Sequence, residues 1–113
     1  MNLGPSTLRY NGGDRYWQRL DRSFHRDDGP AIIWADGHQE WWVNGQRHRD
    51  DGPAVIRDDG TQEWWINGKL HREDGPAIIF ASGLLRWFLN GNPVDPLVHF
   101  LTMGAKNEHH PSL

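Results

Sequence analysis

The heptapeptide His-Arg-x-Asp-Gly-Pro-Ala, in which x is Asp or Glu, occurs three times in this chain of 113 residues. Its copies begin at His25, His48 and His71, so each copy follows the previous one by 23 residues. Copies at one fixed interval indicate a repeat architecture, in which each unit buries its apolar side against its neighbours. Because a chain of this length forms a single domain, 1–113, the repeats constrain most of its fold.

Glycine-bearing dipeptides punctuate each repeat twice. Asn-Gly stands at 44–45, 67–68 and 90–91, and Asp-Gly or Ser-Gly stands at 36–37, 59–60 and 82–83. Both central residues of a type I′ turn have positive φ, so these dipeptides between apolar runs favour two-residue hairpins. The pattern predicts an all-β fold, in which repeated antiparallel β-hairpins with a 23-residue period form a single twisted sheet.

Two-residue turns fix which residues face one another across each Asn-Gly hairpin. Counting outward from the second of these turns places Glu63 opposite Arg72. In the third repeat the same count places Arg86 opposite Asp95, with both signs reversed. Because a reversed charge pair is expected of side chains that touch, we predict an ion pair at both positions.

Side chains of a strand alternate between two faces, and the same count assigns each residue to one of them. Across the Asp-Gly turn Val55 faces Trp64 on the more apolar face, which we predict to be the core. The other face sets an alanine opposite an aromatic ring in each repeat, in the order Trp42, Trp65 and Phe88. A small residue opposite a large one lets the ring lie flat, so this face can stay exposed.

The Asp-Gly-Pro segments predict corners at which the chain steps from one hairpin to the next. Proline cannot donate a hydrogen bond to a neighbouring strand, and glycine within a strand marks a bend. We expect the Asp carboxylate to accept backbone N–H groups there, as in Asx turns.

The segments outside the three repeats are predicted to be caps. The repeats occupy 25–94, and 10–24 reads as a degenerate N-terminal cap. Residues 95–104 are predicted to form a short C-terminal capping helix, because Asp-Pro is typical of an N-cap followed by the first helical position. We expect Leu97, Phe100 and Leu101 to share one helical face over the last hairpin and shield its edge strand. Residues 105–113 are predicted to be a flexible tail.

These hairpins resemble the membrane-occupation-and-recognition-nexus (MORN) repeat, most closely its variant in bacterial antitoxin-like proteins. The segments Leu70-His71-Arg72-Glu73-Asp74-Gly75-Pro76-Ala77 and Trp64-Trp65-Ile66-Asn67-Gly68-Lys69 also resemble a repeat of small proteins from large bacteriophages. The likeness spans about residues 24–92. It implies a scaffold for contacts with no shared catalytic residue. The Trp-Trp pairs and Asp-Gly-Pro corners depart from the common pattern, so a lipid-binding role is not carried over.

Composition narrows the choice of partner and compartment. The formal charge is −3 with both signs mixed, so nucleic acid and anionic membranes are unfavoured. Cysteine is absent, which excludes disulfides and thiolate chemistry. We find no signal peptide and no apolar run of membrane length, so we expect the cytoplasm, that of the host if the protein is phage-encoded.

Histidines and acidic pairs recur in each repeat but do not predict a metal or catalytic site. His25, His48 and His71 would lie two strands apart, roughly 10 Å at about 4.8 Å per strand. One zinc ion, with bonds near 2 Å, cannot reach all three. Catalysis needs one asymmetric constellation, whereas three equivalent acidic pairs are typical of turns. We therefore predict a protein without enzymatic activity and without a cofactor.

An aromatic row with flanking charges is the best candidate site. It consists of the following residues: Trp42, Trp65, Phe88, Arg47, Arg49, Arg72, Glu40 and Glu63. Trp and Arg are the commonest interface hot spots, which favours a recognition face. The alternative is that curvature of the sheet, or a second copy of the chain, buries these rings.

The hypothesis that follows is a non-enzymatic module that binds and inhibits another protein, either a host defence component or a toxin. One alternative is a module that stacks sugars, nucleotides or lipid headgroups on the tryptophans. Another is a structural homo-oligomer joined through its edge strands.

Overall fold

The computed structural model describes residues 4–107, with side chains through Met103. The chain is mostly β, with antiparallel hairpins and one helix, as predicted from the turns. The elements are β1 (Thr7–Asn11), β2 (Asp14–Gln18), β3 (Ile32–Ile33), β4 (Gln39–Glu40), β5 (Trp42–Val43), β6 (Gln46–Arg47), β7 (Val55–Ile56), β8 (Gln62–Glu63), β9 (Trp65–Ile66), β10 (Lys69–Leu70), β11 (Ile78–Ile79), β12 (Leu85–Arg86), β13 (Phe88–Leu89), β14 (Asn92–Pro93) and α1 (Pro96–Asn107).

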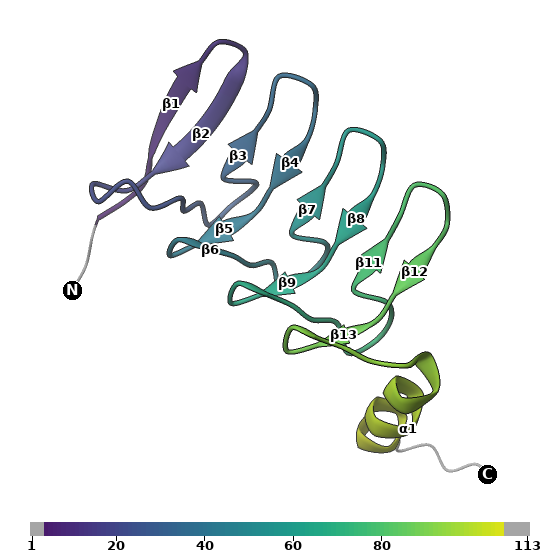
Figure 1. The fold of residues 1–113 in the computed structure, drawn as a ribbon. Coiled ribbons are helices and arrows are strands. Elements are labelled where there is room, and N and C mark those ends of the chain that lie inside the picture. Colours follow the sequence, from purple (N-terminus) through teal and green to yellow (C-terminus); the bar gives the residue numbers. More distant parts are fainter. Residues whose placement is uncertain (1–3, 108–113) are drawn as a thin grey trace.

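The strands divide into one large sheet and three small ones, instead of the single sheet expected. The eight-stranded sheet has the order β1-β2-β3-β4-β7-β8-β11-β12, and the pairs β5/β6, β9/β10 and β13/β14 form separate hairpins. The hairpins β1/β2, β3/β4, β7/β8 and β11/β12 stand side by side, the short hairpins lie at one end of them, and α1 follows the last short hairpin (Figure 1).

A single tryptophan in each repeat separates the large sheet from the small hairpin. The N–H of Trp41 donates to the carbonyl of Ala54 at 2.7 Å, and its own carbonyl accepts from the N–H of His48 at 3.1 Å. Trp64 makes the same two bonds with Ala77 and His71. The N–H of this tryptophan thus pairs with the next repeat, while its carbonyl pairs within its own small hairpin. The strand bends at this residue.

The Asn-Gly turns form as the sequence predicts. Asn44, Asn67 and Asn90 have φ near +50°, and the glycines that follow them have φ near +80°. Positive φ at both positions identifies type I′ turns. The expected register holds, because Leu70 lies opposite Trp65.

The Asp-Gly turns contradict the predicted register. Arg57 N–H donates to the Thr61 carbonyl and Gly60 N–H to the Arg57 carbonyl, which leaves a three-residue loop. Such a loop is a type I turn followed by a glycine with positive φ, and the carboxylate of Asp59 accepts the Thr61 N–H. The pairing therefore slips by one residue, and Val55 faces Glu63 instead of Trp64.

This slip changes which side chains are buried. The buried apolar residues are Ala31, Ile32, Ala54, Val55 and Ala77. They come from both predicted faces, so the prediction that one apolar face forms the core is wrong. Glu40 and Glu63, assigned to the exposed face, are 5% and 7% exposed. A shift of one residue moves a whole set of side chains to the opposite face, which accounts for the error.

The Asp-Gly-Pro corners are organised by arginine and not by Asx turns. Arg49 Nε donates to Asp51 at 3.1 Å and its Nη1 donates to the carbonyl of Pro53. A Cβ built on Gly52 would lie 3.0 Å from the guanidinium carbon of Arg49, so glycine leaves room for it. The guanidinium also lies 3.9 Å above the ring of Trp41. The Asp51 carboxylate thus accepts from a guanidinium, where the sequence predicted backbone N–H groups.

The other corners are built in the same way. Arg26 stacks on Trp17 at 3.8 Å, and Arg72 stacks on Trp64 at 3.9 Å. Each of these arginines bonds the Asp two residues later and the Pro carbonyl four residues later. The recurrent heptapeptide is thus a small loop that holds a guanidinium flat on a tryptophan.

Both ends differ in extent from the predicted caps. The N-terminal hairpin already begins at Thr7, and α1 continues to Asn107. The predicted tail therefore overlaps the helix, and residues 108–113 lie outside the described residues. The N-cap prediction is confirmed, because Asp95 Oδ1 accepts the Leu97 N–H at 2.8 Å.

The helix packs through a different face from the one expected. His99 is 4% exposed, lies 4.8 Å from the Trp87 ring and shares a 2.7 Å hydrogen bond with the Glu73 carbonyl. Leu97 and Phe100, predicted to cover the last hairpin, are 63% and 67% exposed. The last hairpin and the Glu73 carbonyl present a ring and an acceptor side by side, which an imidazole can satisfy together and a leucine cannot.

Candidate functional site

A row formed by Trp42, Arg47 and Trp65, which we call the aromatic row, lies along one side of the molecule. Trp42 lies on β5, Arg47 on β6 and Trp65 on β9. The guanidinium carbon of Arg47 is 5.5 Å from the ring centroid of Trp42 and 5.0 Å from that of Trp65. Both distances allow cation–π attraction. All three side chains are half-buried, so each keeps part of its surface in contact with solvent.

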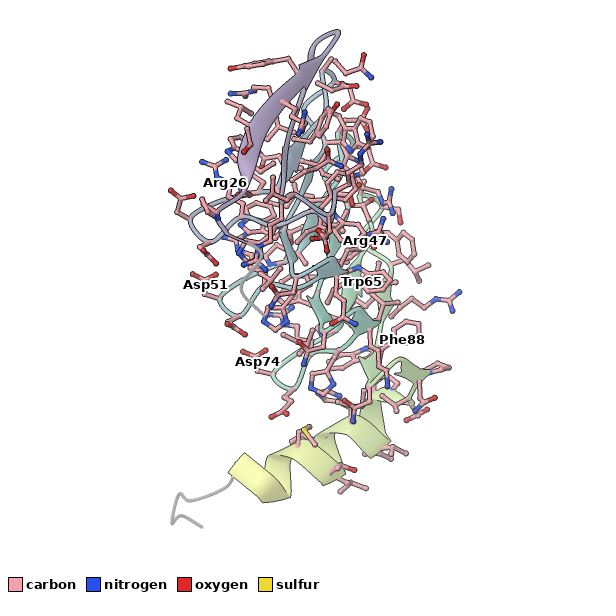
Figure 2. The ribbon with its side chains drawn as sticks, turned by 90° about the vertical axis from the view of Figure 1, so that its left-hand side faces the viewer. Arg26, Arg47, Asp51, Trp65, Asp74 and Phe88 are labelled. Carbon is pink, nitrogen blue, oxygen red and sulfur yellow. The ribbon has the colours of Figure 1, made fainter. Side chains whose placement is uncertain are left out.

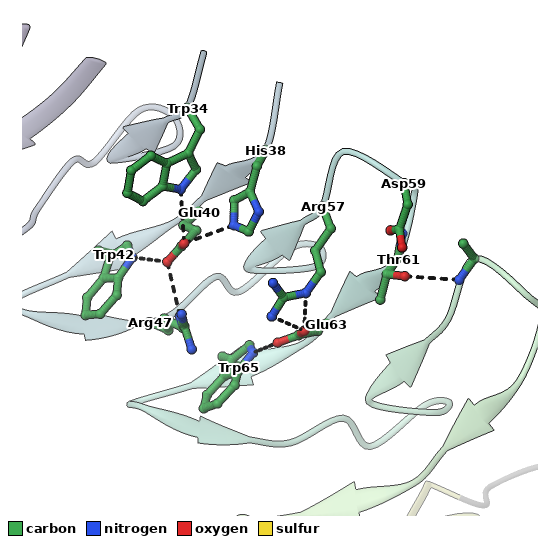
Figure 3. Close-up of polar contacts among 11 residues, drawn as sticks. Trp34, His38, Glu40, Trp42, Arg47, Arg57, Asp59, Thr61, Glu63 and Trp65 are labelled. Carbon is green, nitrogen blue, oxygen red and sulfur yellow. Dashed lines mark hydrogen bonds and ion pairs between the residues drawn. The ribbon is translucent and has the colours of Figure 1, made fainter. Parts of the chain in front are cut away.

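Glu40 fixes the first ring of the aromatic row through a hydrogen bond to its indole N–H (Figure 3). One carboxylate oxygen accepts the indole N–H of Trp42 at 2.9 Å and Arg47 Nε at 3.2 Å. The other accepts the indole N–H of Trp34 at 3.3 Å and bonds His38 Nε2 at 2.9 Å. A buried carboxylate with four partners is satisfied, and it holds Trp42 in one orientation.

The same contacts determine the ionisation of Glu40. Burial opposes the charged form, but the hydrogen bond from Trp42, the charge of Arg47 and the hydrogen bond from Trp34 outweigh it. They hold the pKa of Glu40 below its ordinary value. The carboxylate is therefore charged at neutral pH and accepts these hydrogen bonds as an anion.

Glu63 fixes the second ring in an equivalent way. Its Oε1 accepts the indole N–H of Trp65 at 2.8 Å, and its Oε2 lies 2.7 Å from Nη2 of Arg57 (Figure 3). The predicted ion pair between Glu63 and Arg72 is therefore wrong. Arg72 bonds Asp74, which lies in its own loop and is closer in the chain.

The predicted pair of Arg86 with Asp95 is absent as well among the described residues. Asp95 caps α1, and Arg86 has no ion pair within the part of the chain that the structure describes. The reversal of signs has another explanation. Phe88 takes the place of tryptophan in this repeat and has no N–H, so a carboxylate two residues before it would have nothing to accept.

The eight predicted site residues fall into two groups on opposite sides. Arg47, Trp65 and Phe88 lie on one side of the molecule, while the corner residues Arg26, Asp51 and Asp74 lie on the other (Figure 2). Arg49 and Arg72 belong to the corners by their bonds to Asp51 and Asp74. The aromatic row is thus assembled from Trp42, Arg47 and Trp65 over Glu40 and Glu63, with Phe88 beyond it.

Two grooves between successive corners were not predicted. One measures about 620 Å³ and has Trp64, Ile66 and His71 between the corners of Arg49 and Arg72. The other measures about 600 Å³ and has Trp41, Val43 and His48 in equivalent places. The repeated acidic pairs were the available signal, but a groove depends on the spacing between hairpins, which the sequence does not give.

Carboxylates dominate the rims of these grooves. The side chains of Asp50, Asp51 and Asp74 are 84–87% exposed. The histidines beside them have both nitrogens engaged: His48 Nδ1 accepts the Asn67 N–H at 2.9 Å, and its Nε2 lies 2.8 Å from Asp50. Within residues 4–103, no three His, Asp or Glu side chains gather in a group that could hold a metal ion.

Comparison with protein-family models, with curated proteins and with solved structures finds no match for this chain. Its one helix among the described residues is too short to cross a bilayer.

Proposed function

We propose that this chain is a non-enzymatic protein-binding module that uses the aromatic row to bind a partner and thereby block it. One observation carries this proposal: the half-exposed rings of Trp42 and Trp65 are each held by a buried glutamate, with Arg47 between them. Side chains that are already ordered lose little conformational entropy on binding. Tryptophan and arginine are also the residues that contribute most to interface free energy.

The module is best described as a MORN-like array with a 23-residue period. Three contacts support this description, because each recurs at that interval. His25, His48 and His71 accept the backbone N–H of the asparagine 19 residues later, each at 2.9 Å. Such bonds between successive units are what a repeat protein requires, since each unit is stabilised by its neighbours.

The partner we expect is a host defence component or a toxin, in the cytoplasm of the cell or of a phage-infected host. This part rests on the resemblance of the repeats to antitoxin-like and bacteriophage proteins. A rigid row on one side of an array fits inhibition, because it can occlude a functional surface without chemistry of its own.

Capture from host lysate on the immobilised full chain tests this function. Trp65→Ala leaves Glu63 bonded to Arg57, and Arg47→Gln leaves Glu40 with three other partners, so both variants should fold. We expect each to weaken binding of the captured protein about thirtyfold or more, as hot-spot residues do. Tyr10→Ala, an exposed aromatic outside the row, is the matched control and should bind normally.

Two results would contradict the proposal. One is a partner whose affinity is unchanged by Trp65→Ala and Arg47→Gln but is lost on Asp50→Asn, which would transfer binding to the grooves. The other is a catalytic activity of the purified chain that needs no protein partner.

Sugar binding in the grooves is the second candidate, because their volumes fall within the range of small-molecule sites. Their acidic rims disfavour nucleotides and anionic headgroups, since phosphate would meet carboxylates. Tryptophan fluorescence titrated with neutral sugars tests it. A saturable change that Trp64→Ala abolishes would favour this candidate, and no change would remove it.

A further inference from the structure

Four large apolar side chains of α1 are exposed to solvent. Leu97, Val98, Phe100 and Leu101 are between 51% and 67% exposed. Successive helical residues are about 100° apart, so Leu97 and Leu101 lie roughly opposite His99, which faces the array. We call these four residues the outer face of α1. Among the residues that the structure describes, this face is an apolar surface without a partner.

Docking of α1 on the array does not depend on the outer face. The helix is held by Asp95 at its N-terminus and by His99 against Trp87 and the Glu73 carbonyl. The apolar residues are therefore not explained by stability of the monomer.

Charge favours a second copy of the chain as the occupant. From Pro96 to Met103 the helix contains no Asp, Glu, Lys or Arg, whereas the corners carry exposed carboxylates. Two copies of a net negative protein repel one another least where an uncharged face meets its equivalent. An anionic membrane is a poorer occupant, because interfacial helices bind it through Lys and Arg, which this segment lacks.

The sheet edge at the same end of the molecule points to the same occupant. β12 is the last strand of the eight-stranded sheet, and Leu84 and Leu85 are 56% and 45% exposed. Trp87, which supports α1, directly follows this strand. β12 consists of Leu85 and Arg86, and the backbone along its open edge is a template for pairing with another chain. Two copies related by a twofold axis pair such edges antiparallel, which is the only pairing in this sheet.

The area of a stable interface also requires both the outer face of α1 and the edge of β12. Four half-exposed side chains of this kind offer on the order of 400 Å², about half of the roughly 800 Å² that each partner buries in a standard interface. Leu84, Leu85 and the backbone along the open edge of β12 supply further area at the same end of the array.

We propose that the chain forms a twofold dimer through its C-terminal end, in which the outer face of α1 and the edge of β12 meet their equivalents in a second copy. The contact lies at the end of the array and leaves the aromatic row accessible. Such a dimer presents two aromatic rows to its targets.

Sedimentation equilibrium of the full chain over a concentration series tests the dimer. We expect a species of twice the chain's 13.1 kDa mass. The double variant Phe100→Ser, Leu101→Ser should shift the equilibrium to monomer by at least tenfold in dissociation constant, with an unchanged circular dichroism spectrum. Leu20→Ser, an exposed leucine near the other end, is the matched control and should dimerise normally.

Disulfide trapping gives a second readout in a chain that has no cysteine. Leu101→Cys should form a covalent dimer on mild oxidation, and Leu20→Cys should not. The proposal is overturned if the wild-type chain is monomeric at every concentration, or if the α1 double variant dimerises like wild type. It is also overturned if Leu20→Ser disrupts the dimer equally, or if open-ended polymers form, because a twofold contact closes on itself.

Discussion

In the third heptapeptide the guanidinium of Arg72 covers the ring of Trp64. At the C-terminal end of the molecule the imidazole of His99 covers the ring of Trp87 instead. Arg72 is held by Asp74 and by the Pro76 carbonyl. His99 is presented by a helix instead. Both arrangements place a flat polar group on an indole that would otherwise be open to water.

The difference shows how a single position ends the array. Asp95 stands 23 residues after Arg72, where the next arginine of the series would be. An aspartate cannot stack on Trp87, but it caps α1, and α1 then delivers His99 to that ring. We call these two contacts junctions. The interior junction, on Trp64, is built by a short loop, and the terminal junction, on Trp87, is built by a helix.

Arg72→Ala should have the largest effect on this comparison. It removes the cation–π contact with Trp64 and charge-assisted hydrogen bonds, so we expect a loss of about 3 kcal/mol in the free energy of unfolding. Urea denaturation measures it. Arg72→Lys keeps the charge but not the flat fork, and should fall between wild type and alanine. Equal stability of all three proteins would show that the stack contributes nothing.

His99→Ala should cost less, about 1.5 kcal/mol, and the cost should be confined to the terminal junction. Hydrogen exchange of the α1 amides is the appropriate measurement, because local opening of the helix need not unfold the hairpins. We expect faster exchange in α1 and unchanged exchange in β7 and β8. An equal acceleration in all three elements would mean that the two junctions do not differ.

Gly75→Ala should have a smaller effect that depends on Arg72. A Cβ at position 75 would lie 2.9 Å from the guanidinium carbon of Arg72, so the methyl group displaces the stack at a cost of about 1 kcal/mol. In the Arg72→Ala background the same substitution should cost almost nothing. A double-mutant cycle on thermal unfolding checks this, and additive effects would contradict it.

Acid should weaken the loop-built junctions slightly. A hydrogen bond from Arg26 and the charge of Arg26 hold the pKa of Asp28 below its ordinary value. As pH falls, the unfolded chain takes up this proton first. The contact therefore stabilises the fold above the ordinary Asp pKa, and that contribution disappears as pH falls through the lower folded-state value.

The stability difference between wild type and Asp28→Asn measures this contribution across pH. We expect it to be constant near neutral pH and to vanish in acid. It is the smallest of the four effects because Asp28 is exposed to solvent. A difference that grows as pH falls would have the wrong sign for a lowered pKa.

Features that depend on a few neighbouring residues were predictable. The Asn-Gly turns and the N-cap at Asp95 form as expected, because positive φ and the first free N–H groups of a helix are local requirements. The Asp-Gly turns were not, because the same dipeptide serves two-residue and three-residue loops. That one ambiguity moved Glu40 and Glu63 from an exposed face to a buried position.

The sequence predicted which residue types form the candidate site, but not all of the contacts between them. Trp42, Arg47 and Trp65 do lie together, since they sit beside Asn-Gly turns whose register was right. Arg49 and Arg72 do not join them. Each lies in a short loop and bonds the aspartate two residues later. A partner this close in the chain outcompetes a partner on another strand.

By itself the sequence determined the Asn-Gly hairpins and the position of the helix cap, because turn and cap chemistry act over short distances. The tertiary structure alone decided which carboxylate meets which cation, how tryptophan divides each repeat between two sheets, and which side of α1 packs on the array. Those outcomes follow from competition among partners that are distant in the chain. A side chain bonds the group that packing brings within reach, and packing is a property of the whole array.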